Sequence, residues 1–445
     1  MSISEELRTK VCALIDERQE HIIGLGEAIM DAPELGFKEV RTADRVKKVF
    51  EEVDLPFESE LALTGVKAVL RGKKPGPTVA LMGELDALVV PDHPRADPNT
   101  GAAHACGHNA QIAGLMGATI GLTGADISEH LSGNIVFFAV PAEEYVEISY
   151  RAGLVKEGKT SFLSGKAELI SCGAFDDVDI AIMIHSSSPD ALEGQTGVQS
   201  SSNGFLAKNI TFIGQAAHAA VGPHEGINAL SAAQLALSAI DAQRPTFRDE
   251  DHVRIHPIIT KGGDLVNIIP REVKMETYVR GRTPEAILDA AAKVDRALRG
   301  AAMAIGARVE IETVPGNLPL RPNSELAEIF EKNATHLFGP GTFRNHPHGA
   351  GSTDAGDLSQ IMPLLHPYMT GARGIPHAPN WHIADHDSGY IAPAKTLAMM
   401  AIDLLTEDAA KARAVIEVNP PAMTKDVYLQ QQHAVFSAEV FDGAV

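Results

Sequence analysis

The stretch that decides the fold is NIVFFAVPAEE, residues 134–144, a near-continuous apolar run that ends in a pair of carboxylates. TVALMGELDA (78–87) and DIAIMIH (179–185) have the same character. Apolar runs without alternation are typical of strands that are covered on both faces of a sheet. Helical segments alternate with these runs, for example from about 109 to 122, so the sequence predicts an α/β layered fold.

Outward from this region, the first 30 or so residues are predicted to form one long amphipathic helix that ends at Pro33 and Gly36. Further helices are expected at about 324–338 and, as a long final helix, at about 393–415. The tail from Pro420 either packs on a neighbour or frays, and its composition does not decide between the two.

The character of the sequence changes near Ser200, where SSSNG (200–204) indicates a flexible joint. The segment that follows is expected to run strand, helix, strand, strand, helix, strand, which is the ferredoxin-like order. The predicted organisation is therefore a catalytic domain in two parts, 1–202 and 317–445, with an inserted α+β domain at 203–316.

Charge and composition exclude several function classes. The chain has 445 residues with 38 Lys plus Arg against 58 Asp plus Glu, and a net charge of −20 disfavours binding to nucleic acid or to an anionic membrane surface. No apolar run approaches the ~18–20 residues that span a bilayer, and no secretory signal is visible. Three scattered cysteines do not form a disulfide framework, so a cytoplasmic protein with reduced thiols is expected.

The first group of ligand-type residues is HACGHNAQ (104–111), which places Cys106 and His108 two residues apart in a loop before a helix. That spacing can turn a thiolate and an imidazole toward one cation, and this pair suits zinc, manganese, cobalt or nickel. The alternative is a buried thiol beside a histidine that caps the helix.

The second group is PAEE, in which Glu143 and Glu144 leave a buried strand. Adjacent buried carboxylates are costly unless a cation receives them. One of them can bind a metal while its neighbour acts as a base. The alternative is a solvated acidic start of a helix.

Further candidate ligands follow other segments. His185 ends the run DIAIMIH, and IPHAPNWHIADHD contains His377, His382 and His386, among which spacing does not choose. All these residues lie at predicted strand ends or in the loops after them, where open α/β sheets bind ligands. They suffice for one metal ion or a closely spaced pair.

In the order and spacing of its motifs, the chain resembles the amidohydrolase branch of the metallo-aminoacylase and carboxypeptidase family. That branch includes hippurate hydrolases, N-acyl-amino-acid amidohydrolases and aminobenzoyl-glutamate hydrolase. The motifs that carry the resemblance are APELGFKE (32–39), GELDAL (83–88), HACGHN (104–109), PAEE (141–144), GQAAHAAVGPHEGINAL (214–230), GGDLVNIIP (262–270) and GSTDAGD (351–357).

The resemblance implies a metallopeptidase-type catalytic domain that binds one or two divalent ions, Mn, Zn, Co or Ni, and an inserted domain that forms a homodimer or a higher homo-oligomer. Its implied site residues are Cys106 as a bridging ligand; His108, Glu144, His185 and His377 as further ligands, with His382 as the fallback for His377; Glu143 as general base; Asp86 as the carboxylate that orients a ligand histidine; His218 as a group that reaches the site across the dimer; and Asn267 and Arg280 near the carboxylate of a small-molecule substrate.

The sequence departs from the family pattern at two places. Asn109 and Gln111 stand where the branch usually has an aspartate and a histidine, and an extra segment, PDHPRADPNTGAA (91–103), precedes the HACGHN motif. The expected reaction is metal-assisted hydrolysis of the amide of an N-acyl or N-aroyl amino acid. The alternatives are an aminohydrolase acting on an aromatic amine of the nitroanthranilate type, and a non-catalytic metal-binding assembly protein, which has no need of a base at Glu143.

Overall fold

The computed structural model describes residues 3–444, which form two compact units. Unit 1 comprises the chain up to Ser201 together with Arg321–Pro347 and Asp357–Thr424. Unit 2 comprises Ser202–Leu320, His348–Gly356 and the residues from Lys425. Unit 2 therefore begins where the sequence predicts the insertion, but it also takes the end of the chain, which the prediction assigns to the catalytic domain.

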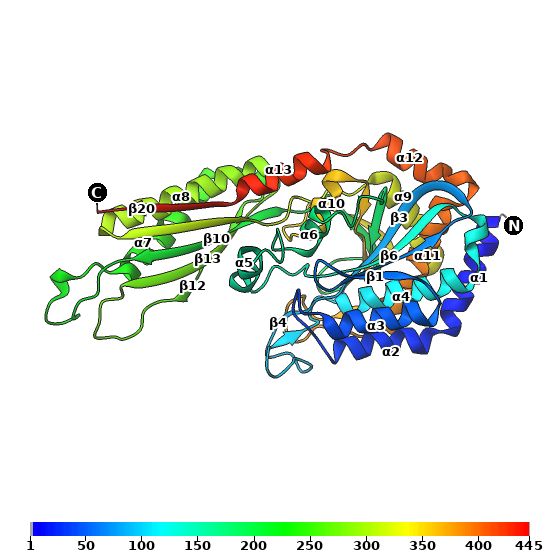
Figure 1. The fold of residues 1–445 in the computed structure, drawn as a ribbon, viewed down its shortest axis with the longest axis horizontal. Helices are drawn as coiled ribbons and strands as arrows, with labels where there is room; N and C mark the ends of the chain where they lie inside the picture. The colour runs from blue at the N-terminus through cyan, green and yellow to red at the C-terminus, as the bar shows by residue number, and fades with distance from the viewer. Residues whose placement is uncertain (1–2, 445) are drawn as a thin grey trace. The chain divides into compact units, whose positions relative to one another are not determined.

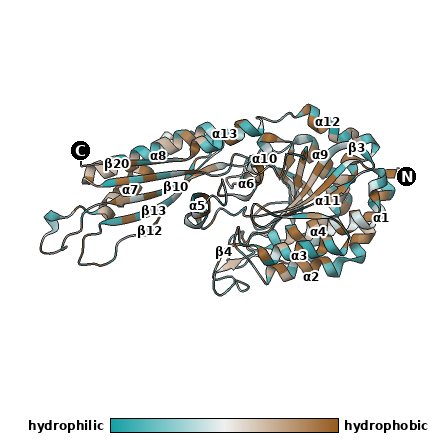
Figure 2. Cartoon of the chain, in the orientation of Figure 1, coloured by the Kyte–Doolittle hydropathy of each residue, from teal (hydrophilic) through white to brown (hydrophobic). Residues whose placement is uncertain are grey.

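A six-stranded sheet in the order β1-β2-β6-β3-β7-β16 forms the centre of unit 1. Strands β6, β3, β7 and β16 are parallel, and β1 and β2 continue the sheet in antiparallel pairing. The inner strands are buried almost throughout, which explains their continuous apolar sequences (Figure 2). The strand bounds are β1 Phe57–Leu61, β2 Gly65–Arg71, β3 Lys74–Glu84, β6 Ser132–Val140, β7 Ile180–Met183 and β16 Leu364–Leu365.

Helices α4 (His108–Gly124) and α11 (Ala392–Leu405) pack on each other and against β3 and β6, and α1 (Ile3–Glu17) and α2 (Gln19–Met30) pack on α4 (Figure 1). This close packing depends on glycine. A Cβ atom at Gly117 would lie 2.7 Å from the Cβ of Ala394. The remaining helices and short strand pairs that surround this sheet are α3 Val40–Glu52, α5 Ile148–Lys156, α6 Gly165–Ser171, α9 Ser324–Phe338, α10 Ala355–Ile361, α12 Ala410–Val418, β4 Leu88–Val89 with β5 Ala102–Ala103, and β18 Ala372–Arg373 with β19 His382–Ile383.

Two predicted long helices are each interrupted. The N-terminal helix breaks at Arg18 into α1 and α2, and this break lets both segments pack against α4. The final helix stops at Leu405, because residues Glu407, Asp408 and Ala409 adopt positive φ angles of 53°, 57° and 55°. In residues 3–444, no helix has both the length and the apolar character that a membrane crossing requires.

A second sheet of unit 1 has the order β15-β9-β17-β8 and follows the first sheet along the chain. Its strands are short: β8 is His185–Ser187, β9 Thr196–Gln199, β15 Phe343–His346 and β17 Tyr368–Thr370. His185 therefore begins a strand of this second sheet, two residues after β7 ends at Met183.

Unit 2 has the ferredoxin-like order that the sequence predicts. Its antiparallel sheet runs β11-β13-β10-β14-β20, with β12 also paired to β13, and helices α7 and α8 pack against it. The bounds are β10 Gly204–Ile213, α7 Ala229–Ala242, β11 Arg254–Ile255, β12 Ile258–Lys261, β13 Glu272–Gly281, α8 Pro284–Ile305 and β14 Arg308–Pro315.

The tail, whose placement the sequence leaves open, is ordered and belongs to unit 2. It forms α13 (Lys425–Val435) and β20 (Ser437–Asp442), and β20 pairs with β14 over the full length of β20. The predicted boundary of 317–445 for the second catalytic segment therefore differs from the structure. The physical reason is the open edge of β14, whose main-chain groups need a partner, and β20 supplies one.

Candidate metal centre

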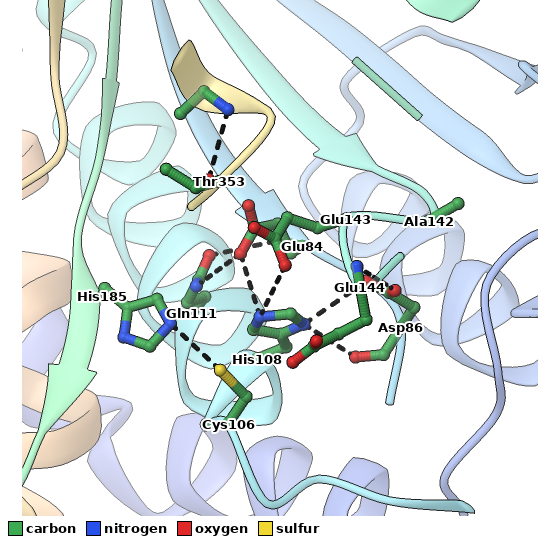
Figure 3. A network of polar contacts seen from close by, with 12 residues as sticks. Glu84, Asp86, Cys106, His108, Gln111, Ala142, Glu143, Glu144, His185 and Thr353 are labelled. Carbon is green, nitrogen blue, oxygen red and sulfur yellow. Dashed lines mark hydrogen bonds and ion pairs between the residues drawn. The ribbon is translucent and has the colours of Figure 1, made fainter. Parts of the chain in front are cut away.

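The residues of the candidate site gather at the carboxyl edge of the parallel sheet of unit 1 (Figure 3). Glu84 ends β3, Glu143 and Glu144 follow the end of β6, and His185 follows the end of β7. His108 is the first residue of α4, which runs beside these strands. Parallel strands bring their ends to one edge, so segments far apart in sequence supply one site.

Two groups of ligand atoms share Cys106. The first consists of Cys106, His108 and His185, and the second of Cys106, Glu144 and His377; within each group the ligand atoms lie within 4.8 Å of one another. The Cys106 Sγ atom is 3.3 Å from Nε2 of His185, and Nε2 of His377 is 3.3 Å from Oε1 of Glu144. A thiolate common to both groups can bridge two ions, the role that the resemblance implies for it.

The three candidate histidines of the C-terminal stretch have different surroundings. His377 lies in the second group, and its loop is fixed by a hydrogen bond from its main-chain N to Ala105 O, 2.8 Å long. His377 and His382 are both exposed, and Nδ1 of His382 lies 3.1 Å from Asn380 O. His386 faces Glu27, at 3.9 Å. Neither of these two residues belongs to a ligand group in the described part of the chain.

Asp86, which the resemblance assigns to orient a ligand histidine, lies against the His108 ring. Nδ1 of His108 lies 2.8 Å from Asp86 O and 3.3 Å from Asp86 Oδ1. The other carboxylate oxygen of Asp86 accepts a hydrogen bond from Glu144 N at 2.9 Å. Because Nδ1 donates to Asp86 O, the neutral form of His108 that binds a metal carries its lone pair on Nε2, the atom that faces the site.

The residues present fit a divalent metal. Nε2 of His108 is buried and has no hydrogen-bond partner among residues 3–444, although Oε2 of Glu84 and Oε2 of Glu143 lie 3.1 and 3.9 Å away. A buried acceptor nitrogen surrounded by carboxylates is costly without a cation. The donor set of thiolate, imidazole and carboxylate suits zinc and the other first-row divalent ions.

The histidines around Cys106 and Glu144 favour the ionised forms of both side chains. Burial and Glu144 oppose ionisation of the Cys106 thiol, but His185 and His108 outweigh them and lower its pKa to about 6. Burial also opposes ionisation of Glu144, and the contact with His377 lowers its pKa to about 2. Burial acts against protonation of His377, yet Cys106 and Glu144 raise its pKa to about 11.

Metal binding is therefore expected to strengthen as the pH rises through neutrality. The pKa values of His108, His185 and His377 are all raised, since Glu84, Cys106 and Glu144 outweigh the effect of burial, so each imidazole keeps its proton to a higher pH than a free histidine does. Histidine binds metal in its neutral form, so binding must release protons, and each proton released raises the apparent affinity about tenfold per pH unit.

Calorimetric titration of the metal-free protein with Zn²⁺, in buffers of different ionisation enthalpy between about pH 6 and pH 8, measures this proton release. An affinity that is unchanged across that range would contradict the assignment of these histidines as ligands.

Glu84 also lies in the site, although it is not among the residues predicted from the sequence. With His108 and Glu143 it forms a third group whose ligand-type atoms lie within 4.8 Å of one another. Lys166 Nζ is 2.5 Å from Oε1 of Glu84, and Gln111 Nε2 donates to Oε2 at 2.7 Å. Burial opposes ionisation of Glu84, but Lys166 and His108 lower its pKa. Gln111, a departure from the family pattern, is thus fixed to Glu84. A signal for Glu84 was available, because this carboxylate ends an apolar strand and stands two residues before Asp86; Lys166 had none.

The extra segment at 91–103 supports the loop that carries His377. His93 is buried, and its Nε2 lies 2.8 Å from Trp381 O in the HAPNW motif. Arg95 ion-pairs with Glu27 and Asp31 of the N-terminal region, at 2.7 and 2.6 Å. The segment is therefore a packed part of unit 1 beside the site.

The predicted residues of the inserted domain lie in unit 2. His218 is exposed, and its Nδ1 accepts hydrogen bonds from the main-chain N of Ala220 and Val221, so its proton is on Nε2. Asn267 O accepts from the main-chain N of Ala219, next to His218, at 3.0 Å.

Arg280 of unit 2 is held in place by several partners. It donates to Ser352 Oγ at 2.7 Å and to His256 Nε2 at 3.2 Å, and its guanidinium lies 5.1 Å from the centre of the Phe205 ring. A fixed guanidinium of this kind suits bidentate binding of a carboxylate.

Comparison with known proteins identifies a family and several relatives of this chain. The model of peptidase family M20/M25/M40 matches residues 80–401. The Xaa-Arg dipeptidase of Mus musculus is 29% identical over 437 residues, covering 91% of this chain and 90% of the relative. The N-acetyl-L-cysteine deacetylase of Bacillus subtilis is 29% identical over 272 residues, or 59% of each chain. A solved Bacillus subtilis structure, described as a dinuclear metal binding peptidase from the M20 family, matches with a TM-score of 0.65 at 22% identity, covering 88% of this chain and 99% of that one.

Proposed function

Because the chain belongs to peptidase family M20/M25/M40, and is thus a hydrolase of C–N bonds, we propose that it cleaves the amide of an N-acyl or N-aroyl amino acid, with dipeptides included in that class. The observation that carries the proposal is the pair of ligand groups that share Cys106, with Glu143 beside them. A Xaa-Arg dipeptidase and an N-acetyl-L-cysteine deacetylase among the relatives support a substrate with an acylated amino acid.

The mechanism follows from the residues at the site. Divalent ions held by Cys106 and its neighbouring ligands would supply Lewis-acid chemistry, which makes water a nucleophile near neutral pH. Glu143 takes the proton of the attacking water and passes it to the leaving nitrogen. Nε2–H of His218 donates to the developing oxyanion, and a donor of this kind is typically worth ~2.7–4 kcal/mol. Arg280 binds the substrate carboxylate.

A substrate panel tests the proposal. The protein, loaded separately with Zn²⁺, Mn²⁺ and Co²⁺, is incubated with N-acetyl and N-benzoyl amino acids, with dipeptides that end in arginine, and with aminobenzoates. Release of a free amino acid is the expected result. Ammonia without an amino acid would instead support the aromatic aminohydrolase, and retained metal without any turnover would support the non-catalytic assembly protein.

Mixing two inactive variants tests whether His218 acts across a dimer. We expect Glu143→Gln and His218→Ala homodimers to be nearly inactive, and their heterodimers to regain activity after subunit dissociation and reassociation. The reason is that a twofold dimer pairs the intact Glu143 of one subunit with the intact His218 of the other. The loss at His218 should lower kcat more than it weakens substrate binding, since the bond forms in the transition state.

His224 provides the matched control, because it lies in the same motif but has no assigned role. A mixture of Glu143→Gln with His224→Ala should show only the activity of the His224→Ala subunits. If mixing with His218→Ala restores nothing, while wild-type subunits survive the same treatment, His218 does not act across the interface.

A further inference from the structure

The turn that carries Glu143 and Glu144 has an unusual backbone. Ala142, directly before Glu143, has a φ angle of 51°, in the left-handed region that a residue with a Cβ rarely adopts. Such a conformation is strained and persists only when surrounding contacts enforce it. From this turn, Glu143 and Glu144 approach the His108 ring from different sides (Figure 3).

Glu39 holds the amide end of the turn. Its Oε1 accepts a hydrogen bond from Ala142 N at 2.8 Å, and its Oε2 accepts one from the Thr64 hydroxyl at 2.6 Å. The Glu39 side chain has no exposed surface. Ala142 N is thus bonded to a fixed, buried carboxylate that lies 103 residues away in sequence.

Arg151 of α5 holds the carbonyl groups of the same turn. Its Nη1 donates to Ala142 O at 3.3 Å and to Leu163 O at 2.9 Å, and its Nη2 donates to Glu144 O at 2.5 Å. One guanidinium therefore bonds the carbonyls on both sides of Glu143. Space for it depends on Gly36, because a Cβ there would lie 2.3 Å from Nη2.

The burial of Arg151 is complete, with 0% of the residue exposed. Moving a guanidinium out of water costs several kcal/mol unless strong hydrogen bonds replace its hydration. An apolar side chain would fill the same volume without this cost. The forked guanidinium bonds three carbonyl groups at once, which neither an apolar side chain nor a side chain with a single donor atom can do.

We propose that Arg151 and Glu39 are positioning residues, which hold the Ala142–Glu144 turn so that Glu144 stays among the metal ligands and Glu143 stays beside them. The inference rests on the proposed function for the role of Glu143 as base, but the placement of Glu144 can be tested on metal binding alone. Asp86 is a third contact of this turn, since it accepts the hydrogen bond from Glu144 N while it also contacts His108. We call Arg151, Glu39 and Asp86 together the clamp.

Co²⁺ binding to the full chain tests the clamp. In Arg151→Met, affinity for the ion that uses Glu144 should fall about 10–100-fold, the range seen when a residue that orients a ligand is removed. The thiolate-to-Co²⁺ absorption band of Cys106 should persist, because Cys106 also belongs to the ligand group with His108 and His185, which does not include Glu144. Amide hydrogen exchange of Ala142 and Glu144 should become faster than in the wild type.

Lys67→Met is the matched control. Lys67 is likewise a buried cation of unit 1 that donates to a main-chain carbonyl, Ala174 O, at 2.8 Å, and it also pairs with Asp177. Its loss should lower the melting temperature but leave Co²⁺ affinity and exchange at the turn unchanged. A purely structural role for Arg151 would give the same pattern as this control.

Arg151→Lys provides a second variant if Arg151→Met does not fold. Lysine keeps the charge but cannot reach three carbonyls in a plane, so Co²⁺ affinity should fall by less than in Arg151→Met and still below the wild type. On an amide substrate, kcat of Arg151→Lys should fall, by up to about 10²-fold for a displacement near 1 Å, with KM changed much less.

Wild-type Co²⁺ affinity together with unchanged exchange at Ala142 and Glu144, in either Arg151 variant, would overturn the inference. Failure of the proposed function looks different. A fully active Glu143→Gln variant would remove the base from the mechanism, whereas the Co²⁺ and exchange results for Arg151 would still decide whether the clamp exists.

Discussion

Glu143→Gln is expected to lower turnover by at least about 10²–10⁴-fold, the range that a general base contributes, while the metal content stays at the wild-type level. The carboxamide has the shape of the carboxylate but does not accept a proton near neutral pH. The measurements are kcat on the amide substrate that the panel identifies and metal per subunit by elemental analysis.

The surroundings of the other buried carboxylates favour Glu143 as the base. Glu84 is ion-paired with Lys166, and Glu144 is in contact with His377; both partners lower the pKa of their carboxyl groups. A carboxylate with a strongly lowered pKa is a weak proton acceptor. We assign proton transfer to Glu143 because it directly precedes Glu144 and its Oε2 lies 3.9 Å from Nε2 of His108.

Glu147→Gln is the control for charge, because Glu147 lies four residues after Glu143 and pairs with Lys38 at 2.8 Å. It should retain normal turnover. A near-normal rate for Glu143→Gln would rule out its role, and a loss of metal in that variant would mean that Glu143 is a ligand.

Much of the fold could be predicted because local sequence and tertiary environment agree. The inner strands are buried on both faces and are therefore apolar throughout, and the family and the C–N hydrolase class implied by the motifs are confirmed. The helix breaks could not be predicted. Arg18 and the segment Glu407–Ala409 contain neither glycine nor proline, and their conformations follow from packing between segments distant in sequence.

The candidate ligands could be selected because each follows a strand end, where its residue type is unusual for the local pattern. The residues that surround these ligands could not be predicted. Arg151 lies only seven residues after Glu144, but the sequence of α5 has no amphipathic pattern that would predict this helix. Lys166 reaches Glu84 over 82 positions, so that contact leaves no local signal. The choice of His377 over His382 depends on a main-chain bond to Ala105, which residue spacing does not reveal.

Cys106→Ala should weaken the binding of both metal ions, because Cys106 is the one residue that the two ligand groups Cys106–His108–His185 and Cys106–Glu144–His377 share. The loss should exceed the ~10–100-fold that follows removal of a residue that merely orients a ligand. Single variants of unshared ligands, His185→Ala and Glu144→Ala, should each weaken mainly one ion. The measurement is equilibrium binding of Zn²⁺ and Co²⁺ against chelators of known affinity.

Cys172→Ala supplies the matched thiol control, since Cys172 is an exposed cysteine of unit 1 outside the ligand groups. It should bind both ions as the wild type does. The packing cost of Cys106→Ala is small, because only one sulfur atom is removed, so a loss of metal would report on coordination rather than on unfolding. If Cys106→Ala lost a single ion and kept the other at wild-type affinity, the thiolate would belong to one ion alone and would not be shared by the two ligand groups.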